Sequence, residues 1–110
     1  MLSEETDEAY AYAERRQSDR RKLIINVEYE RGDGTGIAST REIGVGGLYL
    51  ITNAPLKTGT PLFMRMTIGG EEIGLNGVVI YTNPGNGVGI RFQKISEKNE
   101  ALLKRELNLE

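Results

Sequence analysis

Short stretches in which every second residue is hydrophobic make up most of the chain between residues 23 and 93. This alternation is typical of β-strands that bury one face and expose the other. The first stretch places Leu23, Ile25, Val27 and Tyr29 on one side of a strand. Five further stretches predict strands, over residues 36–43, 48–52, 61–68, 71–82 and 88–93.

Turn signals separate the predicted strands. The pair Gly69-Gly70 is a typical two-residue hairpin connection, and it joins two long stretches into the clearest predicted hairpin. In the first of these stretches Leu62, Met64, Met66 and Ile68 share one face, and we interpret them as core residues. Glycine-rich turns at regular intervals between short strands favour an antiparallel barrel or a sandwich.

The end of the chain has a different pattern. Ser96 is suited to cap a helix, and residues 97–107 continue without glycine or proline, with Leu102, Leu103 and Leu107 as the hydrophobic cluster. The predicted fold class is therefore all-β, with six strands and a C-terminal helix. At 110 residues and 38% hydrophobic content, the chain is long enough for one domain.

The chain contains no cysteine and no histidine. This composition excludes disulfides and thiolate metal sites, and it removes the commonest general base and metal ligand. No hydrophobic stretch approaches the roughly 20 residues that a membrane-spanning helix needs. We therefore expect a cytoplasmic protein that is not inserted in a membrane, is not an enzyme and uses no metal or cofactor.

Positive charge is concentrated in one short segment. Five of the fourteen basic residues lie within residues 15–22, whereas residues 1–14 carry five acids and no base and are expected to be mobile. Guanidinium groups this close together repel one another unless an anion approaches them. Their planar forks suit phosphates and the acceptor edge of guanine, and they stack on flat rings. The segment suggests an anionic ligand that contains a purine, although most such charge runs are simply solvated.

Two motifs give the chain a resemblance to a known family. Arg15-Arg16-Gln17-Ser18-Asp19-Arg20 matches the pattern R-R-x-x-x-R, and Glu42-Ile43-Gly44-Val45-Gly46-Gly47 falls on the pattern [Asp or Asn]-x-Ser-x-x-Gly. In this order and spacing the motifs resemble those of PilZ domains, the bacterial receptor modules for cyclic di-GMP. The resemblance extends from Glu14 to Leu107. It implies a six-stranded antiparallel β-barrel over residues 23–94, preceded by a basic arm that contacts the ligand.

The resemblance also implies which residues bind cyclic di-GMP. Carried over onto this sequence, they are Arg15, Arg16, Arg20, Glu42, Gly44, Gly47 and Tyr81. In the family the Asp or Asn accepts hydrogen bonds from the guanine edge, and the Ser hydroxyl helps to hold the ligand. Glu42 keeps a carboxylate at longer reach, and Gly44 supplies no hydroxyl. Because a lost hydrogen bond costs about 0.5–3 kcal/mol, these departures predict weakened binding rather than none.

Several alternatives remain open from the residues alone. Arg41 and Arg91 are expected to flank the same face, although either could instead pair with an acid such as Glu42. A PilZ domain with an altered second motif could also keep its fold and bind a protein partner without the ligand. A nucleic-acid-binding barrel is disfavoured, because five tyrosines and two phenylalanines are scattered along a chain of net charge −2. If the ligand binds, the arm of residues 15–22 is expected to become ordered and to change the surface offered to a downstream protein.

Overall fold

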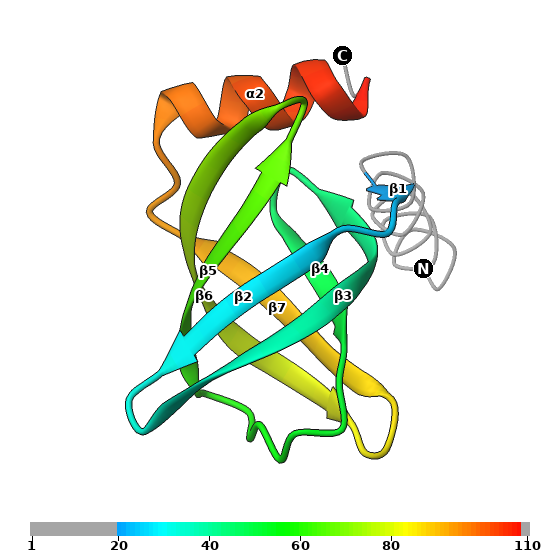
Figure 1. Cartoon of the computed structure of the whole chain (residues 1–110), viewed down its shortest axis with the longest axis vertical. Helices are drawn as coiled ribbons and strands as arrows, with labels where there is room; N and C mark the ends of the chain where they lie inside the picture. The colour runs from blue at the N-terminus through cyan, green and yellow to red at the C-terminus, as the bar shows by residue number, and fades with distance from the viewer. Residues whose placement is uncertain (1–19, 109–110) are drawn as a thin grey trace, which may run out of the picture.

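The structure is a computed structural model, and it describes residues 20–108. This part of the chain forms strands followed by one helix (Figure 1). The bounds of the elements are β1 Arg20–Lys22, β2 Asn26–Arg31, β3 Gly34–Gly44, β4 Gly47–Ile51, β5 Pro61–Ile68, β6 Glu71–Asn83, β7 Gly87–Gln93 and α2 Glu97–Leu107.

The strands β2 to β7 form a closed barrel. Neighbouring strands are hydrogen-bonded in the order β3-β2-β5-β6-β7-β4, and a further pairing between β3 and β4 closes the ring. The pairs within this ring are antiparallel. The predicted six-stranded antiparallel barrel with a C-terminal helix is therefore confirmed, and the sandwich is excluded. The short strand β1 lies outside the ring and pairs with β3.

The first strand was predicted to be continuous from Leu23, and this prediction is wrong. β2 begins at Asn26; Leu23 is exposed and Ile25 is only half-buried. The cause is Thr40, a fully buried residue of β3. Its hydroxyl accepts a hydrogen bond from the Ile25 N–H at 2.9 Å and donates one to the Leu23 carbonyl. Two backbone hydrogen bonds to β3 remain here, from the Leu23 N–H to the Arg41 carbonyl and from the Thr40 N–H to the Ile25 carbonyl. The side-chain bonds of Thr40 interrupt the regular ladder between them and separate β1 from β2.

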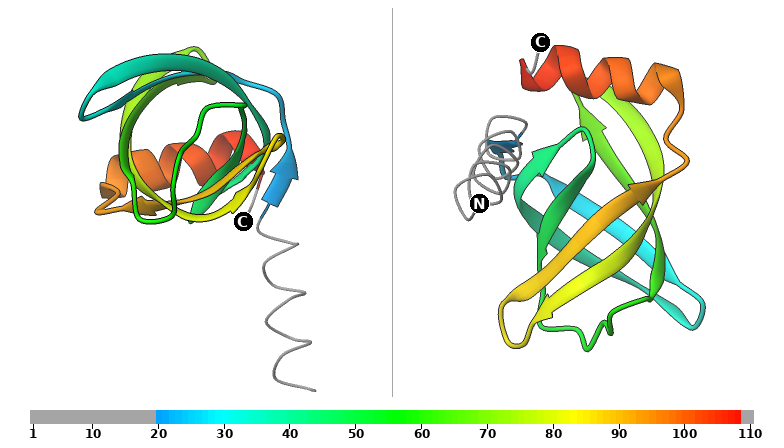
Figure 2. Two further views of the ribbon diagram at one scale, coloured as in Figure 1. Left: turned by 90° about the horizontal axis from the view of Figure 1, so that it is seen from below. Right: turned by 180° about the vertical axis from the view of Figure 1, so that it is seen from behind.

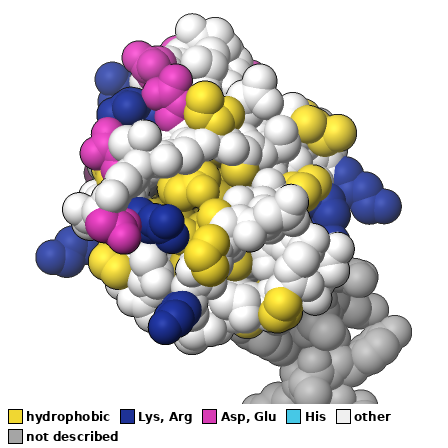
Figure 3. All heavy atoms as spheres, turned by 60° about the horizontal axis from the view of Figure 1, so that its bottom comes forward, with side chains coloured by type: hydrophobic (Ala, Val, Ile, Leu, Met, Phe, Trp, Pro, Cys, Tyr) yellow, Lys and Arg dark blue, Asp and Glu magenta, His cyan; other side chains and the backbone are white. Residues whose placement is uncertain are grey.

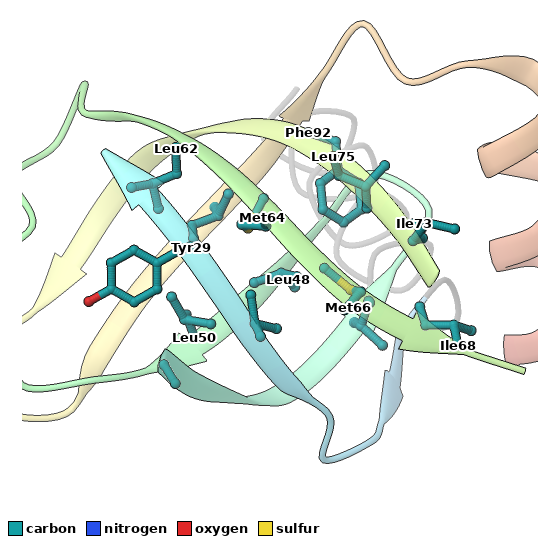
Figure 4. Close-up of a cluster of buried hydrophobic side chains, with 14 of the residues drawn as sticks. Tyr29, Leu48, Leu50, Leu62, Met64, Met66, Ile68, Ile73, Leu75 and Phe92 are labelled. Carbon is teal, nitrogen blue, oxygen red and sulfur yellow. The ribbon is translucent and has the colours of Figure 1, made fainter. Parts of the chain in front are cut away.

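Inward-facing side chains of the strands fill the barrel (Figure 4). Leu62, Met64, Met66 and Ile68 all lie in this core, as their spacing predicted. They pack with residues from the other strands, including Tyr29, Leu48, Leu50, Ile73, Leu75 and Phe92.

Two local signals in the sequence are also confirmed. Gly69 and Gly70 have φ of 60° and 82° and form the turn between β5 and β6, a conformation that only glycine adopts readily at both positions. Ser96 caps α2, since its hydroxyl oxygen accepts a hydrogen bond from the Asn99 N–H at 3.1 Å.

Both ends of the barrel are covered. α2 lies across one end (Figure 1), where Leu102, Leu103 and Leu107 are buried. The segment between β4 and β5 crosses the other end (Figure 2), and its Leu56 is buried there. Seen with this end turned forward, hydrophobic side chains gather in the middle, with acidic and basic ones around them (Figure 3). The two covers leave the outer faces of the strands as the surface on which a ligand site can form.

Candidate ligand-binding face

The second motif lies where β3 meets β1. The last three residues of β3 pair with β1, with Arg20 opposite Gly44 and Lys22 opposite Glu42. The end of the first motif and the start of the second are therefore neighbours in one sheet, although about twenty residues separate them in the sequence.

A bulge in β3 shapes the surface beside this junction. The pairing of β3 with β4 shifts its register between Thr40 and Glu42, so that Arg41 is the extra residue. Ile43 is fully buried inside the barrel, and its neighbour Glu42 therefore lies on the outer face, opposite Tyr49 of β4. A bulge re-aims the side chain of its extra residue, and here it brings Arg41 to the same outer face.

Tyr49 is the centre of this face. It is only 2% exposed although it is not part of the barrel core. The guanidinium carbon of Arg41 lies 3.9 Å from the centroid of its ring, and the Tyr81 ring centroid lies 6.2 Å away at an interplanar angle of 41°. The Asn83 side-chain amide donates to the Tyr49 hydroxyl at 3.2 Å. We call the surface formed by Arg41, Glu42, Tyr49, Tyr81 and Asn83 the Tyr49 face.

Glycines under the Tyr49 face make room for its rings. A Cβ at Gly89 would overlap the ring of Tyr81, and a Cβ at Gly87 would lie 2.6 Å from the ring of Tyr49. At Gly47 a Cβ would overlap the carbonyl oxygen of Ile90 in β7. Gly47 therefore has a packing role between β4 and β7.

The charges on the Tyr49 face are partly paired. Arg41 Nε lies 3.6 Å from Glu42 Oε2, and the two side chains are 55% and 25% exposed. Of the two possibilities that the sequence left open for Arg41, pairing with Glu42 is observed, and so is a place on the same face. An exposed pair of this kind contributes little to stability. For a ligand, the pair places a hydrogen-bond donor, the Arg41 guanidinium, beside an acceptor, the Glu42 carboxylate.

Two other arginines form ion pairs with acidic side chains elsewhere on the barrel and on α2. The pKa of Arg65 on β5 is raised by hydrogen bonds that its guanidinium donates to Glu28 and Glu30, at 3.2 and 2.8 Å. The pKa of Arg105 on α2 is raised chiefly by its hydrogen bond to Glu106. Neither residue belongs to β3, β4 or β6, the strands that carry the residues of the Tyr49 face.

Four of the seven predicted ligand-binding residues lie in or beside the Tyr49 face. Glu42 and Gly44 lie on β3, and Gly47 begins β4. Tyr81 lies on β6 and reaches the same surface through its ring contact with Tyr49.

The remaining three predicted residues belong to the basic arm. Arg20 is described through its backbone in β1, which is paired with β3. Arg15 and Arg16 lie outside the described residues.

Tyr49 itself was missed as a site residue. A signal was present, because Leu48 and Leu50 on either side face the core and the alternation turns Tyr49 outward.

Neither a metal site nor a membrane span is found in the part of the chain that the structure describes. Across residues 20–108, no group of three or more acidic, histidine or cysteine side chains is placed to hold a metal ion. Within the same residues, no helix is both long and apolar enough to cross a membrane.

Comparison with known proteins decides the family. The PilZ domain family matches the chain over residues 14–109. The chain belongs to the PilZ family. PilZ domains are receptor and adaptor domains, and the family is one of receptors for cyclic di-GMP. No curated protein sequence matches the chain.

Two solved structures are similar to this PilZ domain. The PilZ domain of CeSA from a cellulose-synthesizing bacterium has a TM-score of 0.65 at 24% identity, covering 82% of this chain and 96% of that one. The Bacillus subtilis inhibitor of motility, MotI/DgrA, has a TM-score of 0.67 at 17% identity, covering 81% of this chain and 48% of that one. At these identities the likeness shows the shared fold.

Proposed function

We propose that this PilZ domain binds cyclic di-GMP and acts by binding rather than by catalysis. The contacts would come from Arg15, Arg16, Arg20, Glu42, Gly44, Gly47 and Tyr81. The arginines would meet the phosphates and stack on the guanine bases. The carboxylate of Glu42 would accept hydrogen bonds from a guanine edge.

The register of β1 on β3 is the observation that carries this proposal. Arg20 lies opposite Gly44, so the last arginine of the first motif adjoins the second motif. Lys22 lies opposite Glu42 in the same pairing. The arm therefore ends beside the Tyr49 face, and a ligand on that face would be close to Arg20.

The departures in the second motif make the expected affinity modest. Glu42 places its carboxylate one methylene farther from the backbone than Asp would, and its side chain is already paired with Arg41. Gly44 offers no hydroxyl. With about 0.5–3 kcal/mol for each lost or weakened hydrogen bond, a dissociation constant in the micromolar range is expected rather than a nanomolar one.

The proposed response to the ligand is ordering of the basic arm, residues 15–22, beside an acidic segment, residues 1–14. The last three residues of this arm pair with β3 as strand β1, so the response would concern the residues before Arg20 and the way in which β1 is held on β3. Two phosphates would offset the repulsion between the arginines, and the altered surface would be read by a protein partner. The size of the response is limited by the difference in ligand affinity between the two states of the arm. We place this function in the bacterial cytoplasm, with neither nucleic acid nor membrane insertion involved.

Titration calorimetry with cyclic di-GMP tests the proposal. Arg16→Ala and Arg20→Ala should each weaken binding by about 1.5–3 kcal/mol, as expected for hydrogen bonds to charged groups. Lys98→Ala on α2 removes an exposed cation far from the arm in sequence and serves as the control. The melting temperature without ligand should be nearly unchanged in all three variants. A large fall in melting temperature for either arginine variant would show a structural role and contradict the site assignment.

A second candidate function is binding of a protein partner without the ligand. The changed residues Glu42 and Gly44 favour it, and so do two large hydrophobic residues, Ile24 and Ile37, which are 78% and 76% exposed and line the same surface pocket. Exposed hydrophobic side chains that lie together are typical of protein contact surfaces. Titration calorimetry that shows no heat of binding at several hundred micromolar cyclic di-GMP would favour this second function. That concentration is on the order of 100 times a micromolar dissociation constant.

A further inference from the structure

The guanidinium of Arg41 lies over the ring of Tyr49, in a side chain that is also exposed to solvent. Its central carbon lies 3.9 Å from the centroid of the Tyr49 ring, which is a close cation–π contact. The side chain nevertheless remains 55% exposed. Because the Tyr49 ring is almost completely buried, the exposed part of the Arg41 side chain is the part that does not contact the ring.

This arrangement is held from several directions. The Tyr49 hydroxyl accepts a hydrogen bond from Asn83, and the ring packs beside Tyr81. Arg41 itself is the extra residue of a bulge and pairs with Glu42 at 3.6 Å. A side chain fixed in this way loses little further freedom when a ligand binds to it.

We infer that Arg41 is a stacking surface for one planar base of the ligand. The base, the guanidinium and the Tyr49 ring would then form three layers. Glu42 beside the stack would present an acceptor to the N–H groups of the base edge, which suits guanine. Tyr81, 40% exposed beside Tyr49, would border the base. This inference rests on the proposed function, and it adds a base-recognition residue that lies in neither motif.

Substitutions at Arg41 separate stacking from charge. Arg41→Lys keeps the positive charge and loses the planar group, whereas Arg41→Gln loses the charge. Arg105→Lys is the matched control, because Arg105 is also exposed and paired with an acid, Glu106. Calorimetry with cyclic di-GMP should give a dissociation constant about 5- to 20-fold higher for Arg41→Lys, and at least as high for Arg41→Gln. The control should stay within about twofold of the wild type. Melting temperatures without ligand should be unchanged, since an exposed pair contributes little to stability.

A change under the stack gives a second readout. Tyr49→Phe keeps the ring and removes the hydroxyl that binds Asn83, so its loss of affinity for cyclic di-GMP should be smaller than that of Arg41→Lys if the ring is what supports the stack. A loss at Tyr49→Phe as large as that at Arg41→Lys would contradict a role for the ring alone.

Each outcome at Arg41 decides the inference. Weaker binding by both Arg41 variants at unchanged melting temperature supports it. Wild-type affinity in Arg41→Lys, with or without a loss in Arg41→Gln, overturns stacking while the proposed function stands. Absence of binding by the wild-type chain itself overturns the proposed function and this inference together.

Discussion

The hydroxyl of Thr40 binds the segment between β1, the end of the basic arm, and β2, the first strand of the barrel. Removing this hydroxyl tests whether the segment holds the arm in place. The residue is completely buried, and its hydroxyl joins the Ile25 N–H and the Leu23 carbonyl in the crossing between β1 and β2. Thr40→Val replaces the hydroxyl by a methyl group of similar volume, so the core keeps its packing. A buried donor or acceptor left without a partner costs about 1–3 kcal/mol. The substitution leaves both the Ile25 N–H and the Leu23 carbonyl without this partner.

The expected effect is local as well as global. A loss of about 1–3 kcal/mol lowers the melting temperature by about 4–8 °C per kcal/mol in a domain of this size. If this loss of free energy is confined to residues 23–25, between β1 and β2, the equilibrium constant for local opening of that segment rises by about 5- to 150-fold. The Leu23 amide donates to the Arg41 carbonyl at 3.3 Å, a bond that the substitution does not remove. Hydrogen exchange at Leu23 therefore reports whether β1 has loosened, and the affinity for cyclic di-GMP should fall by about 3- to 10-fold because the arm is no longer held at the site.

Thr40→Ser is the matched control. It keeps the hydroxyl and loses a buried methyl group, which costs about 1 kcal/mol. It should lower the melting temperature, leave the Leu23 amide protected and leave cyclic di-GMP affinity unchanged. Equal exchange at Leu23 in the Val and Ser variants would refute the role given to the hydroxyl. Faster exchange with unchanged affinity would instead mean that β1 has no part in ligand binding.

Two further predictions concern the second motif. Glu42→Asp combined with Gly44→Ser should tighten cyclic di-GMP binding by about 1–3 kcal/mol, because it restores a hydroxyl and shortens the reach of the carboxylate. Gly44 lies in extended strand but is buried, so the melting temperature without ligand is measured beside the affinity; unchanged affinity in the folded double variant would mean that this segment is not the guanine site. Gly47→Ala should lower the free energy of unfolding by about 1–3 kcal/mol in urea denaturation, because its Cβ overlaps the Ile90 carbonyl oxygen. Gly46→Ala is the control, because a Cβ at Gly46 meets nothing within 4 Å, and it should change the free energy of unfolding by less than about 1 kcal/mol. Equal losses of unfolding free energy in the Gly46 and Gly47 variants would contradict the packing argument.

Local signals in the sequence predicted most of the fold. The alternation from Leu62 to Ile68 depends only on which face of β5 meets the core, and it gave the correct bounds for that strand. Gly69-Gly70 and Ser96 act through their own backbone neighbours, so their residue types alone indicated a turn and a helix cap. These features could be predicted because the interactions that cause them span only a few residues.

The features that were missed depend on distant residues. The interruption at Leu23–Ile25 is caused by Thr40, which lies fifteen residues from Ile25. Tyr49 is buried on the outside of the barrel because Gly87 leaves space under its ring and Asn83 binds its hydroxyl. A pattern of hydrophobic positions does not show which glycine lies beneath which ring. The candidate site could therefore be predicted as a set of residues, but its Tyr49–Arg41 stack could not.

The strand β3 explains how ligand binding could act on the arm without deforming the barrel. Directly behind the Tyr49 face, Ile43 and Leu48 are at most 1% exposed, and a close-packed core resists small displacements. Strand β1, in contrast, is three residues long and is joined to β2 through the hydroxyl of Thr40. Glu42 belongs to the rigid barrel and lies opposite Lys22 of the short strand β1, so a ligand at Glu42 would lie between the two. We therefore expect its binding energy to appear as a change in β1 and the residues before it, and not as a change in the core.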